Sequence, residues 1–429
     1  MSPDTQMMVA LVLFIITYVL MIALSKYRPF VALTSAVIFV ILGIMPLDEV
    51  FSAIDWNVLM MLAGTMGTVF LFIESKMPNR LADMILKKTP NLMWVAVAMS
   101  LFAGIVSAFV DNVATVLMIA PVGFAICKRL NVSPVAMMIC ISVSSNLQGA
   151  ATLVGDTTSI MLGGYADMNF LDFIFMNGRP GIFWAVELGA LVTIPVVMFF
   201  FRKQRDRIDA GEVTTVEDYF PSFLLLATVV LLIIASFIPN TPKLINGYIC
   251  MGLFIIGLVR SAFKNKNFIT TKLALRDIDF MTLLLLSSLF VVIKSLENAG
   301  VIDAIADMFV KVGGDNLFLM YTLIVWGSVL MSAFIDNIPY VATMLPVVSG
   351  IAHIMGCSPY VLYYGLLTGA TLGGNLTPIG ASANIATIGI LQKQGYKVKT
   401  SDFLKIGVPF TLAAVMTGYL FIWFTWHTA

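Results

Sequence analysis

The sequence predicts an all-α integral membrane protein made of two inverted repeats, each with a re-entrant hairpin and five spans, one of them broken. Three observations lead to this fold class. The 429 residues are 59% hydrophobic and only 11% charged, whereas soluble domains carry about 25% charged residues. Apolar runs long enough to cross a bilayer follow one another along the chain. Polar interruptions in some of these runs recur at a constant offset.

The uninterrupted apolar runs are expected to cross the lipid bilayer as single helices. They lie at 7–24, 29–46, 56–73, 179–201, 221–239, 243–261, 280–297 and 406–427. The N-terminus lacks the basic segment and cleavage site of a signal peptide, so the first run is expected to remain in the membrane. Residues 78–90 are predicted to form a short interfacial helix.

Four apolar regions are interrupted by polar residues and match in pairs at an offset of 225. Regions 91–127 and 316–353 carry a central Asp-Asn and are predicted to be re-entrant hairpins. Regions 134–165 and 359–390 contain Gly, Thr, Ser and Asn and are predicted to be broken helices. The hairpin stretch Ser107-Ala-Phe-Val-Asp-Asn112 returns as Ser332-Ala-Phe-Ile-Asp-Asn337. The broken-helix stretch Thr152-Leu-Val-Gly155 returns as Thr377-Pro-Ile-Gly380.

The domain boundaries and the orientation of the repeats follow from counting crossings. Each half crosses the membrane an odd number of times, so the second half is inverted relative to the first. The first repeat is expected at 1–201, a polar cytoplasmic linker at 202–220 and the second repeat at 221–429.

The distribution of Lys and Arg residues assigns the two sides of the membrane. In this arrangement 21 of the 25 Lys and Arg residues, Arg28 among them, fall on one side, which the positive-inside rule makes the cytoplasm. Both termini are therefore expected outside. The first hairpin opens to the cytoplasm and the second to the outside. The expected location is the inner (plasma) membrane of a bacterium or archaeon.

Several function classes are not supported by the composition. The net charge of +1 gives no reason to expect nucleic acid as a partner. The four cysteines are scattered and are interpreted as small buried hydrophobes. Since no nucleophile–base pair or metal cluster is recognisable, no catalytic residue is predicted and the protein is not expected to be an enzyme.

The two hairpin tips carry the first candidate site residues. A carboxylate in an apolar core is by default functional or paired, so Asp111 and Asp336 are predicted to line an ion site. An alternative role for both is capping of the helix that follows. Asn112 and Asn337 are expected either to contact the site or to brace the tips.

The broken helices carry the second set of candidates. Gly and Pro interrupt the helices, and Thr, Ser and Asn cluster at both interruptions. Such side chains also join helices within membranes, but their coincidence with both breaks favours a binding site. Asp156 aligns with Ala381, so the two halves differ in charge.

The predicted site consists of two overlapping sets of residues. The predicted metal ligands, with Na⁺ as the expected coupling ion and H⁺ as the alternative, are Asp111, Asn112, Gly155, Asp156, Asp336, Asn337, Thr377, Gly380 and Ala381. The predicted substrate-binding residues are Asn112, Thr115, Thr157, Thr158, Asn337, Thr343, Pro378, Ser382 and Asn384. The predicted core contains no Lys, Arg or His, so a bare dianion would be repelled unless cations accompanied it.

These motifs carry a family resemblance that covers nearly the whole chain. The distinctive stretches are Ser107 to Val113, Ile335 to Pro339, Gly373 to Asn384 and Gln394-Gly-Tyr-Lys. Through them the chain resembles the ion transporter superfamily with a citrate-transporter-like domain. It is most similar to the branch of arsenite permeases, D-type sodium–proton antiporters and the melanosomal P protein, and is related to the divalent anion:sodium symporters. The resemblance implies a scaffold part and a transport part, a homodimer and elevator-type movement.

The motifs also depart from their relatives. The sodium-coupled dicarboxylate branch carries Ser-Asn-Thr at both hairpin tips, where two Na⁺ and the substrate carboxylates bind. Here the triplets are Asp111-Asn112-Val113 and Asp336-Asn337-Ile338, so only the Asn positions carry over. The P-protein branch often has Pro-Pro-Asn after the Gly-Asp, where this chain has Thr157-Thr158-Ser159.

The resemblance favours a symporter that moves a small anion or carboxylate with Na⁺ or H⁺. A sodium–proton antiporter is the second hypothesis, because an acidic core suits competition between Na⁺ and H⁺. An arsenite or oxyanion exporter is the third. From another class, an ion channel would use the same pore-lining oxygens.

Overall fold

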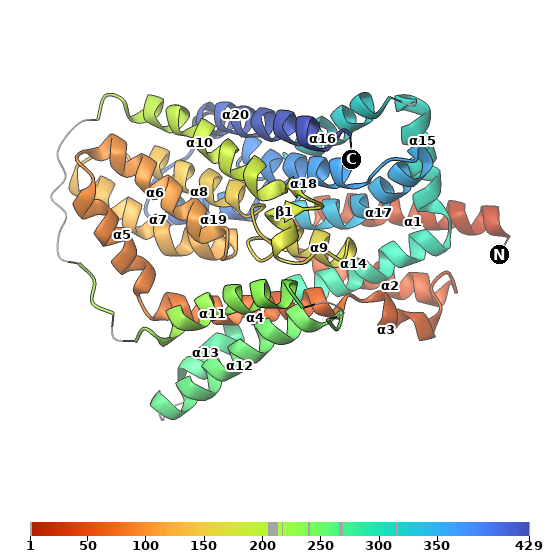
Figure 1. Cartoon of the computed structure of the whole chain (residues 1–429), viewed down its shortest axis with the longest axis horizontal. Coiled ribbons are helices and arrows are strands. Elements are labelled where there is room, and N and C mark those ends of the chain that lie inside the picture. Colours follow the sequence, from red (N-terminus) through yellow and green to blue (C-terminus); the bar gives the residue numbers. More distant parts are fainter. Residues whose placement is uncertain are drawn as a thin grey trace.

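The computed structural model describes residues 2–204, 213–216, 218–238, 241–265, 269–314 and 316–428. These residues form an almost entirely helical molecule (Figure 1), which agrees with the predicted fold class. Within the predicted linker 202–220, residues 205–212 and 217 lie outside the described part. Among the described residues, eight helices are long and apolar enough to cross a membrane.

Helices occupy every span that the sequence predicts in the first half. Their bounds are α1 (Pro3–Ala23), α2 (Arg28–Ile41), α3 (Val50–Ala53), α4 (Trp56–Glu74), α5 (Met77–Lys88), α6 (Leu92–Ser107), α7 (Asn112–Arg129), α8 (Val135–Gln148), α9 (Thr157–Tyr165) and α10 (Ile182–Phe201). The sequence does not predict the antiparallel hairpin of β1 (Phe175–Met176) and β2 (Arg179–Pro180), because strands of two residues leave no periodicity to recognise.

The second half repeats this order of helices. Its elements are α11 (Phe220–Ser236), α12 (Ile245–Asn265), α13 (Ile269–Asp277), α14 (Phe280–Asn298), α15 (Val301–Gly313), α16 (Leu317–Ser332), α17 (Asn337–Met355), α18 (Tyr360–Gly373), the 3₁₀ turn η4 (Gly374–Leu376), α19 (Ser382–Lys393) and α20 (Thr400–Trp426). The sequence does not predict α15, whose acidic and basic residues interrupt its apolar face.

Matching caps begin the corresponding helices of the two halves. The Asp55 carboxylate accepts from the Val58 N–H at 3.0 Å at the start of α4, and Asp279 caps α14 in the same way. Asn91 and Asn316 cap α6 and α16. Asp111 and Asp336 cap α7 and α17, so the capping role expected for both acids is confirmed.

The helices form two groups with the broken helices inside. Figure 1 shows α4, α11, α12 and α13 along the lower edge and α10, α16 and α20 along the upper edge. In the lower group α4 packs on α12, and α2 packs on α14. In the upper group α6 packs on α8, α16 on α18 and α10 on α20. Figure 1 also shows both termini toward one end of the molecule and α5 at the other.

The cysteines are free, as the sequence predicts. Cys127, Cys140 and Cys250 are buried and Cys357 is half-buried. They pack as small apolar side chains, and none takes part in the site described below.

Candidate functional site

Each interrupted helix is fastened to the hairpin tip of its own half. In the first half the Thr152 hydroxyl donates to the Ala108 carbonyl, and in the second half the Thr377 hydroxyl donates to the Ala333 carbonyl. The two donors lie 225 positions apart in the sequence, and so do the two acceptors, as the sequence alignment implies. The inverted relation of the repeats across the membrane stays a prediction.

A glycine in each break allows three carbonyl oxygens to crowd against it. A Cβ on Gly155 would lie 2.6 Å from the Gly149 oxygen and 2.9 Å from those of Ser107 and Ala108. Around Gly380 the corresponding oxygens, at 2.6, 2.7 and 2.9 Å, belong to Gly374, Ser332 and Ala333. Backbone atoms cannot yield as a flexible side chain does, so only glycine fits. Both breaks therefore bring three backbone carbonyls together at the hairpin tips.

Buried asparagines join the two halves at their centre. The Asn146 amide, on α8, donates to the Thr371 carbonyl at 2.8 Å and to Asn375 Oδ1 at 3.1 Å. Asn146 Oδ1 in turn accepts from the Asn112 amide at 2.8 Å. Asn146 and Thr371 are not among the predicted site residues, although they are alignment partners at the offset of 225. An amide in the apolar run before the break is the signal that would have found Asn146.

A cavity of about 280 Å³ opens between the tips, the breaks and α4. Its predicted site residues are Asp111, Asn112, Gly155, Asp156 and Thr157 from the first half and Asp336, Asn337, Ala381 and Ser382 from the second. Leu62, Thr65, Met66 and Val69 of α4 form the facing wall, and Asp277, Asp279 and Thr282 line another side. The fold thus brings together residues that lie more than 200 positions apart in the sequence.

Other predicted site residues lie behind the cavity wall. The Thr158 hydroxyl donates to Asp156 Oδ2 at 3.1 Å and supports that carboxylate from the side. Thr115 contacts the Val110 carbonyl at 3.4 Å, and Thr343 bonds to the Tyr18 hydroxyl. Asn384 Oδ1 accepts from Ser142 at 2.7 Å and joins the halves. Thr377, Pro378 and Gly380 shape the second break without lining the cavity.

The cavity is strongly acidic. Five carboxylates line it, those of Asp111, Asp156, Asp277, Asp279 and Asp336, and no Lys, Arg or His is among the described lining residues. Asp111 and Asp156 are close enough to repel each other when both are charged. An arrangement of this kind is stable only when cations or protons balance the carboxylates.

One cation nevertheless reaches the site from outside the predicted core. Arg28 Nη1, at the start of α2, lies 3.0 Å from Asp336 Oδ2. The expectation of a core without Lys, Arg or His therefore holds for the described residues that line the cavity but not for the partner of Asp336. Arg28 follows the first span, where a basic residue indicates a cytoplasmic loop, and only the packing of α1 and α2 shows where its long side chain ends.

The cavity consists of a first half-site, with Asp111, Asn112 and Asp156, and a second half-site, with Asp336, Asn337 and Ala381. The two differ in how far their polar atoms find hydrogen-bond partners. In the first, Asn112 Oδ1 is buried without a hydrogen-bond partner in the described structure, and Asp111 accepts only from the backbone N–H groups of Val113 and Ala114. In the second, Asn337 Oδ1 accepts from Ser332 at 2.6 Å. Buried acceptors are rarely left unpaired, so the polar atoms of the first half-site are less completely satisfied than those of the second.

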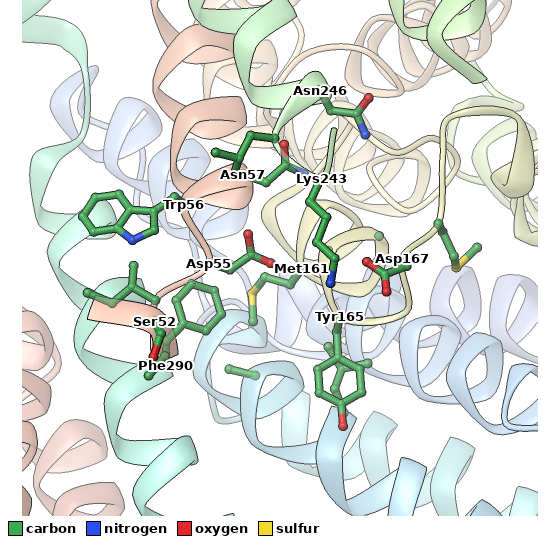
Figure 2. A pocket seen from close by; sticks show the side chains of 18 of the residues that line it. Ser52, Asp55, Trp56, Asn57, Met161, Tyr165, Asp167, Lys243, Asn246 and Phe290 are labelled. Atoms are coloured by element: carbon green, nitrogen blue, oxygen red, sulfur yellow. The ribbon is translucent and has the colours of Figure 1, made fainter. Parts of the chain in front are cut away.

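A second cavity, of about 630 Å³, lies at the other end of α9 and beside the middle of α17. Figure 2 shows the Lys243 amine pointing between the carboxylates of Asp55 and Asp167. Burial raises the pKa of Asp55, although the Val58 N–H and Lys243 work in the opposite direction. Both cavities lie between α4 and α14 on one side and α9 and α17 on the other. A cavity therefore occupies each end of the same helix interface.

The first cavity offers oxygen ligands of mixed type. Among the described residues, no group of three or more His, Cys, Asp and Glu side chains converges as a metal centre. A cation at Asp111 and Asp156 would thus share these carboxylates with Asn112 Oδ1 and with backbone carbonyls. Carbonyls and amide oxygens at unwound helix segments are the ligands by which transporters hold Na⁺.

Comparison with known proteins places this geometry among transporters. Residues 11–366 match the family described as citrate transporter, CitMHS. The chain is 30% identical over 432 residues to the "Uncharacterized transporter Rv2684" of Mycobacterium tuberculosis, covering 97% of both proteins. It is 24% identical over 503 residues to the "P protein" of Homo sapiens, covering 98% of this chain and 60% of that protein.

A solved structure has a similar fold. The YdaH transporter of Alcanivorax borkumensis aligns with a TM-score of 0.61 at 13% identity, covering 88% of this chain and 87% of that one. At this identity the likeness concerns the fold alone. The overall fold is thus one that a known membrane transporter also adopts.

Proposed function

Because the chain is an integral membrane transporter of the citrate transporter family, we propose that it moves a small anion or carboxylate together with a cation, Na⁺ or H⁺. The observation that carries this proposal is the acidic cavity, with five carboxylates and no cation among its described lining residues. An anion enters such a site favourably only when cations neutralise its walls.

The first half-site is the proposed position of the cation. The carboxylates of Asp111 and Asp156 supply negative charge, and Asn112 Oδ1 is an acceptor without a donor. An unpaired buried acceptor destabilises a protein by roughly 1–3 kcal/mol, and a bound Na⁺ would remove that penalty.

The helix N-termini are the proposed position of the anion. The first residues of α7, α9, α17 and α19, namely Asn112, Thr157, Asn337 and Ser382, all line the cavity. Helix N-termini carry a partial positive charge and free N–H groups, which favour a carboxylate. The α19 end is the more suitable of the two broken-helix ends, because Ala381 stands there in place of Asp156.

Movement between the two cavities is the proposed route across the membrane. Both cavities border α4 and α14; they lie at opposite ends of α9, one at the start of α17 and the other beside its middle. An elevator-type shift of the hairpins and broken helices along α4 and α14 would carry the site from one cavity to the other. The homodimer implied by the resemblance remains an expectation.

Transport by the purified full-length chain in proteoliposomes tests the proposal. Uptake of labelled citrate or succinate should rise when a Na⁺ or H⁺ gradient is imposed. Asp156→Asn should reduce the driven flux at least tenfold, because it removes a carboxylate of the cation site. Asp307→Asn, at an exposed acid on α15, is the matched control and should transport like the wild type. A flux indifferent to both gradients would overturn the coupling.

A sodium–proton antiporter is the second candidate, favoured by the same shortage of cations around the cavity. Carboxylates without a basic partner can exchange a proton for Na⁺ with no anion present. In proteoliposomes that contain no carboxylate, a Na⁺ gradient alone should then change the internal pH. A saturable exchange of this kind, with counterflow, would favour the antiporter and argue against a channel.

A further inference from the structure

The second half-site already contains a positive charge that belongs to the chain. Arg28 Nη1 lies 3.0 Å from Asp336 Oδ2, and the two side chains are only 22% and 14% exposed. The Arg28 Nε–H donates to the Met21 carbonyl at 3.3 Å, which fixes the guanidinium in place. Asp336 Oδ2 also accepts from the Ser382 hydroxyl at 3.1 Å, and Oδ1 accepts from the Ile338 N–H at 3.2 Å. Both carboxylate oxygens are thus occupied.

Among the described residues, no basic side chain pairs with Asp111 as Arg28 pairs with Asp336. In the second repeat α12 takes the place of α2, and the positions 224 and 225 residues beyond Arg28 are Gly252 and Leu253. Neither residue can neutralise Asp111. Within the part of the chain that the structure describes, the charge of Asp336 is therefore balanced by the protein, whereas that of Asp111 is not.

The asparagines that follow the two acids show the same difference. Ser332 donates to Asn337 Oδ1 at 2.6 Å. Its counterpart Ser107 bonds instead to Ser145 at 3.1 Å, and Asn112 Oδ1 is left without a donor in the described structure. The acceptors that a cation would use are occupied in the second half-site and open in the first.

We propose that the Arg28 guanidinium takes the place of a bound cation in the second half-site, so that each chain binds one coupling cation, at Asp111, Asn112 and Asp156. This inference rests on the cation coupling proposed above and adds its stoichiometry. Because an Arg side chain stays charged at every physiological pH, the second half-site is neutralised whether or not Na⁺ is present. Arg28 acts through Asp336 and is a positioning residue.

The stoichiometry of Na⁺ binding tests this role directly. Equilibrium binding of ²²Na⁺ to the purified full-length chain in detergent should saturate at one ion per chain. Arg28→Met, which keeps the length of the side chain but removes its charge, should raise the number to two and make the binding curve steeper. Arg28→Lys restores a charge and should return it to one.

Controls separate this inference from a folding defect and from the proposed function. Arg28→Met with Asp336→Asn lacks both charges and should bind one Na⁺, which also shows that the first half-site is intact. Two Na⁺ per wild-type chain would overturn the inference and leave cation coupling standing. One Na⁺ in a monodisperse Arg28→Met protein would overturn it as well. No Na⁺ in the wild type but one in Arg28→Met would support the inference and overturn Na⁺ as the coupling ion.

Discussion

Single residues set the geometry of both breaks. Gly155 and Gly380 each face three carbonyl oxygens at less than 3.0 Å from the place a Cβ would occupy. The carbonyls belong to the hairpin tip and to the end of the preceding helix of the same half. Any larger side chain would push the break away from the tip, and the cavity residues on both segments would move apart.

Gly155→Ala should therefore abolish transport and lower stability. Forcing a methyl group into a packed site destabilises proteins by roughly 1–3 kcal/mol, and here the three neighbours are backbone atoms. Loss of gradient-driven uptake by more than tenfold, with a lower melting temperature in detergent, is the expected result. Gly389→Ala on α19 is the control, because its Cβ would meet open space. Normal uptake by Gly155→Ala would show that the close approach is not needed.

The acidic residues of the site can be predicted from the sequence more readily than the side chains that pair with them. Asp111, Asp156 and Asp336 are conspicuous because carboxylates are rare in apolar runs and two of them recur at the offset of 225. Arg28 is invisible to the same reasoning, because its position at the end of a span is ordinary for a basic residue. Whether Asn112 Oδ1 has a donor depends on side-chain contacts that no sequence pattern encodes.

At the scale of elements, α1 and α2 hold the start of α17 through two contacts. Arg28 pairs with Asp336, and the Tyr18 hydroxyl on α1 bonds to the Pro339 carbonyl and to Thr343 on α17. The second hairpin is thereby attached to helices that pack on α14. The structure shows no hydrogen bond of this kind from the described residues of α11 or α12 to the first hairpin.

Tyr18→Phe should loosen this attachment without disturbing the packing of the ring. Removal of one buried hydroxyl is expected to lower the free energy of unfolding by about 0.5–1.5 kcal/mol. Thermal unfolding in detergent measures the change, and Tyr27→Phe, at an exposed ring, is the matched control. Equal melting temperatures for Tyr18→Phe and the wild type would show that the contact contributes nothing.

A polar cluster holds the segment before α11 against α12. Arg260 Nη1 lies 2.6 Å and Lys264 Nζ 2.9 Å from Asp218 Oδ2. Partial burial acts to raise the pKa of Asp218. Hydrogen bonds from Arg260 and Lys264 outweigh it and keep this pKa well below its usual value of 3.8. A carboxyl group whose pKa is lowered in the folded state stabilises that state above its unfolded pKa.

The stability difference between wild type and Asp218→Asn should therefore depend on pH in one direction. It should be constant between about pH 8 and pH 5 and should shrink as the pH falls below about 4, where the unfolded carboxyl group becomes protonated. Thermal unfolding across this range measures it, with Asp307→Asn as the exposed control. A difference that grows as the pH falls would contradict the assigned cause.

At the scale of the whole molecule, the sequence predicts more of the helices than of the connections. Every predicted span coincides with a helix because a hydrophobic run of that length has few alternatives. The amphipathic α15 and the short β1–β2 hairpin escape prediction, since neither produces a long apolar run. Asn146 contacts Thr371 and Asn375 because of the way the two halves pack. The alignment at the offset of 225 does not by itself predict these contacts.

The predicted orientation in the membrane is testable on intact cells. In a Cys357→Ser background, single cysteines at the exposed positions Asp4, Lys88 and Thr428 are treated with a membrane-impermeant maleimide. Asp4→Cys and Thr428→Cys should react from outside, and Lys88→Cys only after permeabilisation. Reaction of Lys88→Cys on intact cells would reverse the assignment of sides.

Under the cation coupling proposed above, the Arg28–Asp336 ion pair limits how far the solute can be concentrated. A charge that belongs to the chain cannot be released on the other side of the membrane, so it draws no energy from the ion gradient. Each co-transported Na⁺ contributes about 1.4 kcal/mol per tenfold concentration ratio and about 2.3 kcal/mol per 100 mV of membrane potential. With one Na⁺ per solute and no potential, a tenfold Na⁺ gradient supports roughly tenfold accumulation of the solute, where two ions would support roughly a hundredfold. Under the one-cation scheme proposed above, Arg28 lowers the accumulation ratio and reduces the number of ions that each transported molecule requires.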